Sequence, residues 1–144
     1  MTSIFSVTVS DDVATLVWDD PTRPVNVKSR EAISELAQHV ERLLADDSVK
    51  GVVLVSGKSS FLAGGDLDEL YAASSPQDVS ALLAPVRAVM RRIELGGKPF
   101  VAAIHGMALG GGLEMALACH RRVASSSRAT QLGLPEVTLG LMPG

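Results

Sequence analysis

Two short stretches near the amino terminus alternate between apolar and polar residues. Residues 4–9 (IFSVTV) and 13–18 (VATLVW) are rich in β-branched side chains, and Asp11-Asp12 between them is a turn signal. We therefore predict a β-hairpin. A third apolar stretch, residues 52–56 (VVLVS), has no alternation, which is typical of a strand that is buried on both faces.

Two longer stretches carry apolar side chains at helical spacing. In residues 30–47 these side chains recur at i, i+3, i+4 and i+7, and Ser29 is suited to cap the first turn. His39 lies off this apolar stripe and is expected to be solvated. Residues 76–95 follow the same spacing, although Pro85 is expected to kink or interrupt that helix.

The order of the predicted elements indicates an α/β fold. After the second long helix, a strand is expected at 100–104, a helix at about 110–118 and a short strand at 121–126. Residues 25–27 are expected to form a short extended piece, and residues 56–75 a glycine- and serine-rich loop that runs into a short helix. The chain thus repeats strand, strand, helix within one domain of 144 residues.

Composition narrows the class of protein. The apolar fraction of 47% is enough for a sizeable core, and a net charge of −3 without large basic clusters argues against nucleic acid as a partner. The single cysteine, Cys119, excludes an internal disulfide and suggests a reducing compartment. The amino terminus has no signal-peptide pattern, so we expect a cytoplasmic protein. The one apolar stretch near membrane-spanning length, residues 98–119, contains Lys98, His105 and Glu114, which argue against a membrane span.

Candidate chemistry gathers at two glycine-rich junctions between a strand and a helix. The first is residues 61–66 (FLAGGD), and the second is residues 106–114 (GMALGGGLE), where three consecutive glycines precede a helical pattern that carries Glu114. Such a junction presents bare backbone N–H groups at a helix N-terminus, where negative charge is stabilised. We predict that the second junction is half of an oxyanion-stabilising site. Taken one at a time, these glycines and carboxylates are equally explained as turns and helix caps.

The sequence does not match the motifs of several other classes of binding site or enzyme. The GKS at 57–59 has Val52 where a phosphate-binding P-loop needs glycine, and the glycines of the second junction do not fit a dinucleotide fingerprint. No GxSxG motif of a serine hydrolase is present. His39, His105 and His120 lack paired metal-ligand spacing, so no metal site is expected.

Four separated motifs together resemble the enoyl-CoA hydratase/isomerase (crotonase) family. They are F-x-A-G-G-D-L at 61–67, H-G-M-A-L-G-G-G-L-E at 105–114, A-C-H-x-R-V-A at 118–124 and L-G-L-P-E-V-x-L-G-L-M-P-G at 132–144. The match covers nearly the whole chain in the right order, and it is most similar to the hydratase part of multifunctional fatty-acid oxidation enzymes.

The resemblance implies a fold and a set of catalytic groups. The fold would be a spiral of repeated ββα units, and the substrate a coenzyme A thioester. The oxyanion hole would consist of the backbone N–H groups of Gly65 and Gly111. Glu114 would orient and activate water, and Glu136 would exchange a proton at C2 of the substrate. A double-bond isomerase of this family needs mainly the second glutamate, so the presence of both favours a hydratase.

The resemblance also implies substrate-binding positions. Backbone around Ala63 and Gly64 would bind the adenine end of coenzyme A, and Asp66 is expected beside the substrate. Tyr71 is a further candidate for the acyl pocket. Coenzyme A belongs to the substrate, so no separate cofactor is expected; NAD would be needed only if a dehydrogenase domain follows.

Residues 1–144 are interpreted as the N-terminal portion of such a domain, with a spiral that is incomplete at the C-terminus. The last residues are an apolar, strand-like run that ends in a Pro-Gly turn. The expected function is syn addition of water to 2-enoyl-CoA thioesters in fatty-acid β-oxidation, in a homo-oligomer or a multienzyme complex. An enoyl-CoA isomerase and a non-catalytic acyl-CoA-binding module remain alternatives, and the acyl chain length stays open.

Overall fold

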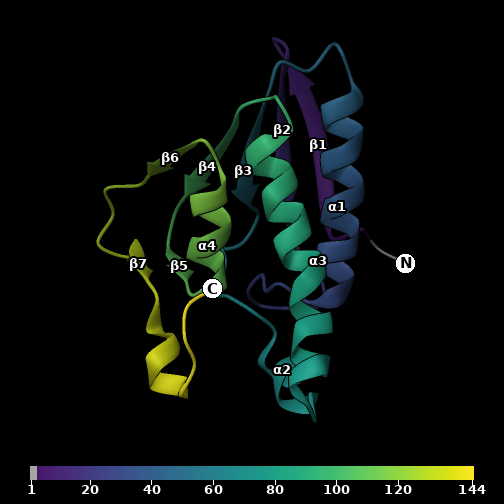
Figure 1. Cartoon of the computed structure of the whole chain (residues 1–144). Coiled ribbons are helices and arrows are strands. Elements are labelled where there is room, and N and C mark those ends of the chain that lie inside the picture. Colours follow the sequence, from purple (N-terminus) through teal and green to yellow (C-terminus); the bar gives the residue numbers. More distant parts are fainter. Residues whose placement is uncertain (1–2) are drawn as a thin grey trace.

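The computed structural model describes residues 3–144 and contains a five-stranded mixed sheet (Figure 1). The strand order is β1-β2-β3-β4-β6, in which β1 pairs antiparallel with β2 and the other neighbours are parallel. The strands are β1 (Phe5–Ser10), β2 (Val13–Trp18), β3 (Gly51–Ser56), β4 (Phe100–Ile104) and β6 (Arg121–Ala124).

The predicted hairpin is confirmed. Phe5 pairs with Trp18 and Ser10 pairs with Val13, so the register runs through both strands without a slip. Asp11 and Asp12 have φ values of 50° and 63°, which is the backbone of a tight hairpin turn that aspartate tolerates.

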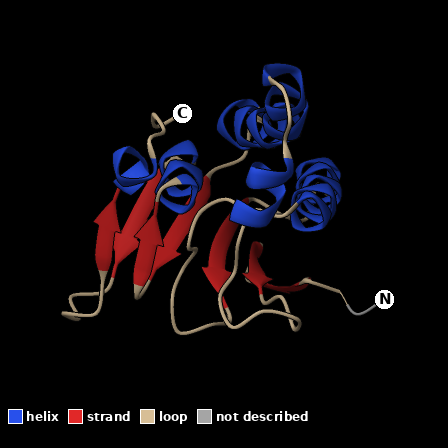
Figure 2. Cartoon of the chain, turned by 90° about the horizontal axis from the view of Figure 1, so that it is seen from below, coloured by secondary structure: helices blue, strands red, loops and turns tan. Residues whose placement is uncertain are grey.

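The helices lie on one side of the strands (Figure 2). This arrangement makes the expectation for residues 52–56 wrong: along β3, buried side chains such as Val52 and Leu54 alternate with half-buried ones such as Val53 and Val55. The buried side chains point into a core shared with the helices. The helices are α1 (Arg30–Ala45), α2 (Leu67–Ala72), α3 (Pro76–Leu95), α4 (Gly111–Ala118) and the 3₁₀ helix η1 (Pro135–Leu139).

The two long helices begin at the predicted caps. The hydroxyl of Ser29 accepts a hydrogen bond from the N–H of Ala32, and that of Ser75 accepts one from Asp78. Pro85 does not interrupt α3, which runs as one α-helix of 20 residues. The exposed side of α3 tolerates the proline ring, and packing of Val86, Val89 and Ile93 against the core holds the helix on both sides of it.

A second, smaller ladder runs beside the large sheet. It contains β5 (Met107–Leu109) and β7 (Gln131–Gly133), which pair in parallel, and it continues through two isolated parallel bridges, Lys28 with Gly65 and Leu62 with Ala108. The extended piece predicted at 25–27 is therefore only a single bridge at Lys28.

Each strand of the large sheet from β2 onward is followed by a piece of this ladder and then by a helix. The order is β3, residues 62–65 and α2; then β4, β5 and α4; then β6, β7 and η1. This repetition confirms the ββα spiral. The strand-like run expected at the end of the chain is instead η1 in its first part, because Pro135 starts a helical turn.

The spiral determines where the helix N-termini lie. Parallel pieces of the small ladder end at the same edge, so the turns that follow them are neighbours in space. These turns contain both glycine-rich junctions. None of the helices in residues 3–144 has the length and apolar character needed to cross a membrane.

Candidate functional site

A pocket of about 410 Å³ opens at the edge where the small ladder ends. That size lies within the range of small-molecule sites in proteins. Gly64 and Gly65 of the first junction, Gly110 and Gly111 of the second, and Glu136 of η1 all line it. Its remaining wall is mostly apolar and includes Leu67, Leu70, Leu82, Leu83, Val86, Leu139 and Leu141.

The first junction is fixed by backbone hydrogen bonds to the preceding repeat. The N–H of Ala63 donates to the carbonyl of Asn26 over 3.0 Å, and the carbonyl of Gly64 accepts from the N–H of Lys28 over 2.8 Å. Gly64 has φ +110°, a conformation that needs glycine. Gly65, the next residue, lines the pocket.

Asp66 lines the pocket, but local contacts occupy its carboxylate. It caps α2 by accepting the N–H groups of Asp68 and Glu69, and Arg23 Nη2 lies 2.6 Å from Oδ2. Asp66 is 7% exposed. Its side chain therefore shapes the loop that carries Gly65.

The second junction requires glycine for two different reasons. Gly110 caps α4 with φ 52° and ψ −127°, and its N–H donates to the carbonyl of Gly133 over 2.8 Å. A Cβ on Gly112 would stand 2.1 Å from the carbonyl oxygen of Leu62, so glycine here allows the two junctions to pack together.

The N–H groups of Gly65 and Gly111 find no hydrogen-bond acceptor among residues 3–144. Gly111 is the first residue of α4, where intrahelical acceptors are lacking. The two junctions nearly touch, since a Cβ on Gly64 would stand 3.8 Å from the nitrogen of Gly111. Two free donors at one pocket wall, one of them at a helix N-terminus, can stabilise a negatively charged oxygen.

Glu136 brings a carboxylate to the same wall. Its Oε1 lies 2.9 Å from the position that a Cβ on Gly110 would take. Its Oε2 is buried without a hydrogen-bond partner within residues 3–144. Because unpaired buried carboxylate oxygens are costly, this one indicates a group kept for a ligand or a proton.

Glu114 does not line this pocket. Its Oε2 lies 3.3 Å from Lys28 Nζ, and its Oε1 accepts the N–H of Gly144 over 2.7 Å. It faces a separate, shallower hollow beside α3 and α4, together with Arg87 and Leu117. The structure thus brings Gly65, Gly111 and Glu136 together, while Glu114 is linked to the pocket through Lys28.

Lys28 was not singled out from the sequence. It lines the pocket, its side chain is only 6% exposed, and it is the ion-pair partner of Glu114. A single lysine in the loop before a helix cap belongs to no sequence motif. Its possible role becomes visible only from its burial in the structure. Tyr71, in contrast, is 73% exposed and is not part of the pocket wall.

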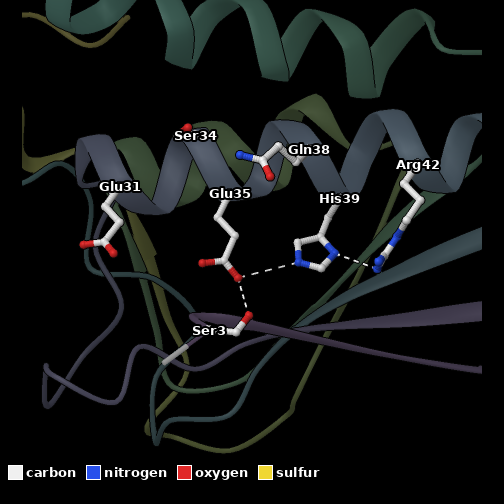
Figure 3. Close-up of a pocket in the computed structure, with 7 residues that line it drawn as sticks. All are labelled: Ser3, Glu31, Ser34, Glu35, Gln38, His39 and Arg42. Atoms are coloured by element: carbon white, nitrogen blue, oxygen red, sulfur yellow. Dashed lines mark hydrogen bonds and ion pairs between the residues drawn. The ribbon is translucent and has the colours of Figure 1, made fainter. Parts of the chain in front are cut away.

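A second hollow, of about 600 Å³, lies along the polar side of α1 (Figure 3). Four of its side chains contact one another: Glu35 accepts from Ser3, and His39 lies between Glu35 and Arg42. His39 is half-buried against Phe5, contrary to the solvated position expected for it. This hollow lacks the pair of glycine-rich junctions that lines the first pocket.

The remaining histidines also have structural contacts. His105 Nε2 lies 2.6 Å from the carbonyl oxygen of Lys58, and His120 Nδ1 accepts the N–H of Phe100 over 3.1 Å. Across residues 3–144, no group of three His, Cys, Asp or Glu side chains is placed to hold a metal ion.

Relatives of this chain are known among fatty-acid oxidation proteins. The fatty acid oxidation complex subunit alpha of Shewanella amazonensis is 44% identical over 146 aligned residues, which cover 100% of this chain and 21% of the relative. That of Idiomarina loihiensis is 45% identical, over 97% of this chain and 20% of the relative. The chain therefore spans about a fifth of the length of these curated relatives.

Solved structures share the fold. An enoyl-CoA hydratase from Bacillus anthracis superposes with a TM-score of 0.89 at 31% identity, covering 99% of this chain and 54% of that chain. An enoyl-CoA hydratase from Thermoplasma volcanium gives 0.90 at 24% identity, covering 99% of this chain and 56% of the other, which speaks for the fold alone. A family model described as enoyl-CoA hydratase/isomerase matches residues 8–144. With the ββα spiral and the paired glycine junctions, these matches show that the chain belongs to the enoyl-CoA hydratase/isomerase family.

Proposed function

We propose that this protein is an enoyl-CoA hydratase that adds water, with syn geometry, to 2-enoyl-CoA thioesters in fatty-acid β-oxidation. The observation that carries the proposal is the meeting of two free N–H donors, from Gly65 and Gly111, with the orphaned carboxylate of Glu136 in one pocket. The curated relatives of the chain are named as subunits of a fatty acid oxidation complex, which supports this reaction class.

The two donors would stabilise the charge that develops during the reaction. When the oxygen of water bonds to C3, electron density moves through C2 to the thioester oxygen, which becomes enolate-like. Hydrogen bonds from Gly65 and Gly111 to that oxygen lower the barrier, and losing one such donor typically costs about 3–4 kcal/mol. The dipole of α4 adds to the effect at Gly111.

Two carboxylates would divide the proton transfers. Glu114 would orient the water and take its proton as the C3–O bond forms, and Glu136 would deliver a proton to C2, so that one water is added overall. Glu136 already lines the pocket. Glu114 would act from its position behind Gly111.

The rest of the pocket fits a thioester with an apolar chain. Leucine side chains from α2, α3 and the last residues make the apolar part of the pocket wall, and removal of this apolar surface from water favours an acyl chain. Backbone around Ala63 and Gly64, at the pocket rim, would bind the adenine end of coenzyme A. No separate cofactor takes part in this reaction; NAD would enter only through a further dehydrogenase domain.

An enoyl-CoA isomerase is the second candidate, and one observation favours it. Of the two glutamates expected to be catalytic, Glu136 lines the pocket, while Glu114 lies outside it in an ion pair with Lys28. Moving a double bond needs one group that removes a proton and returns it, and a single carboxylate suffices for that.

We further propose a cytoplasmic protein that works as a homo-oligomer or within a multienzyme complex. The buried single cysteine is consistent with a reducing compartment. Apolar side chains are exposed late in the chain, among them Leu117, Val123, Val137 and Met142. Light scattering on the purified full-length protein measures its assembly state.

The proposed reaction is tested by supplying the unmodified protein with crotonyl-CoA and, separately, with a 3-enoyl-CoA. A hydratase forms 3-hydroxybutyryl-CoA from the first substrate faster than it isomerises the second, and in heavy water it places deuterium at C2 on the same face as the new hydroxyl. Isomerisation that far exceeds hydration would select the second candidate. Acyl-CoA binding with neither hydration nor isomerisation would show that the protein is a non-catalytic binding module.

A further inference from the structure

Lys28 has a buried ammonium group between the pocket and α4. Its side chain is 6% exposed, and Nζ lies 3.3 Å from Oε2 of Glu114, whose own side chain is 18% exposed. Burying a lysine is costly unless a negative charge and hydrogen bonds compensate. The protein nevertheless keeps this cation at the centre of the candidate site.

Lys28 contacts both glycine junctions. Its backbone bridges to Gly65, and its N–H donates to the carbonyl of Gly64 over 2.8 Å. At the other end, Cε and Nζ both lie 2.2 Å from the position that a Cβ on Gly111 would take. The missing side chain of Gly111 is therefore the space that the ammonium group fills.

The same space holds one oxygen of Glu114. Oε2 lies 3.4 Å from the Cβ position of Gly111, on the side where Lys28 Nζ meets it. The other oxygen, Oε1, accepts the N–H of Gly144 over 2.7 Å. One carboxylate oxygen of Glu114 is thus paired with a cation, and the other accepts a backbone N–H.

We infer that Lys28 is a positioning residue for Glu114. Its ammonium group fixes Oε2 beside Gly111 and so sets the orientation of the carboxylate that would act on the water. This inference rests on the proposed hydratase function. Lys28 itself exchanges no proton with the substrate, so its effect appears in the turnover of the reaction and depends on Glu114.

The test is a pair of double-mutant cycles in the full-length protein with crotonyl-CoA as substrate. Lys28→Met keeps an unbranched side chain, one atom shorter, and removes the charge. We expect kcat to fall about 10- to 100-fold, as for loss of one charge-assisted hydrogen bond, with KM changed less than about threefold. In a Glu114→Gln background Lys28→Met should change kcat less than about twofold, whereas in a Glu136→Gln background its full effect should remain.

Arg92→Met is the matched control. It removes a cation from another ion pair, with Glu41, on the outer surfaces of α3 and α1. Its kcat should equal that of the unmodified protein. Circular dichroism verifies folding, and Lys28→Gln replaces Lys28→Met if the methionine variant does not fold.

The outcomes separate the two proposals. An unchanged kcat in the Lys28 variant, or a full effect of Lys28→Met in the Glu114→Gln background, overturns the positioning role and leaves the hydratase function standing. An unmodified protein that binds crotonyl-CoA without hydrating it overturns both.

Discussion

Gly110 combines a positive φ with a position directly beside the Glu136 carboxylate. Its φ of 52° is one that residues other than glycine rarely adopt, and a Cβ there would stand 2.9 Å from Oε1 of Glu136. Gly97 has φ +88°, but a Cβ there would meet nothing within 4 Å. An alanine at either position would strain the backbone, but only an alanine at Gly110 would also contact the Glu136 carboxylate.

We predict that Gly110→Ala and Gly97→Ala each lower the free energy of unfolding by about 1–3 kcal/mol, the cost of a strained backbone. Only Gly110→Ala should also lower kcat, by about tenfold or more, because it displaces Glu136. Urea unfolding and crotonyl-CoA hydration measure the two effects. Equal kcat values for the two variants would show that Glu136 does not depend on the space at Gly110.

Cys119 predicts a pH dependence of stability. Burial raises the pKa of this thiol to about 12, although the neighbouring Arg122 lowers it. Between pH 9 and pH 12 the unfolded chain loses the thiol proton and the native protein keeps it, so the unfolded state binds fewer protons. The free energy of unfolding should therefore fall as pH rises, by up to about 1.4 kcal/mol per pH unit from this group.

Urea unfolding at pH 8 and pH 10.5 measures this contribution, because Cys119→Ala removes it while other titrating groups stay the same. The unmodified protein should lose more stability than Cys119→Ala between these two values. Equal losses would contradict a buried, neutral thiol.

At the scale of elements, Glu35 joins the start of β1 to α1 (Figure 3). Its two oxygens accept the N–H groups of Ile4 and Phe5, each over 3.1 Å, and the hydroxyl of Ser3. Burial alone would raise the pKa of Glu35, but these hydrogen bonds outweigh it and hold the pKa below its usual value. The contribution to stability is therefore present above the pKa of the unfolded chain and is lost as pH falls through the lower, native pKa.

Glu35→Gln should lower the free energy of unfolding by about 1–2 kcal/mol at pH 7. The difference from the unmodified protein should shrink as the pH falls below 4, because both side chains are then neutral. Thermal or urea unfolding across this pH range checks the prediction, with Glu31→Gln, an exposed neighbour in the first turn of α1, as the control. A difference that persists undiminished at low pH would show that the carboxylate charge is not what holds β1.

Local signals in the sequence were sufficient for most elements. Alternation and the Asp11-Asp12 turn predict the hairpin, and caps at Ser29 and Ser75 predict where the long helices begin. The prediction was wrong where tertiary packing decides. Pro85 lies inside α3 without interrupting it, although an interruption was one of the two effects expected, and β3 is covered by helices on one side only.

At the scale of the whole molecule, the motifs predict which glycines meet but not how the carboxylates lie. Gly65, Gly111 and Glu136 line one pocket, as a site built from separated motifs requires. Glu114 lies behind Gly111 because Lys28, 86 positions away in the sequence, holds it there. Spacing along the chain contains no information about such a pair, and only the winding of the spiral brings it together.

We propose that Glu136, beside the donors of Gly65 and Gly111, carries the proton transfer of a hydratase. The most direct test is the kcat of Glu136→Gln for crotonyl-CoA hydration, measured beside Glu41→Gln, an exposed glutamate on α1. Loss of a general acid–base group predicts a fall of about 10²- to 10⁴-fold for Glu136→Gln with substrate binding retained, and no change for Glu41→Gln. Turnover by Glu136→Gln equal to that of the unmodified protein would contradict the account.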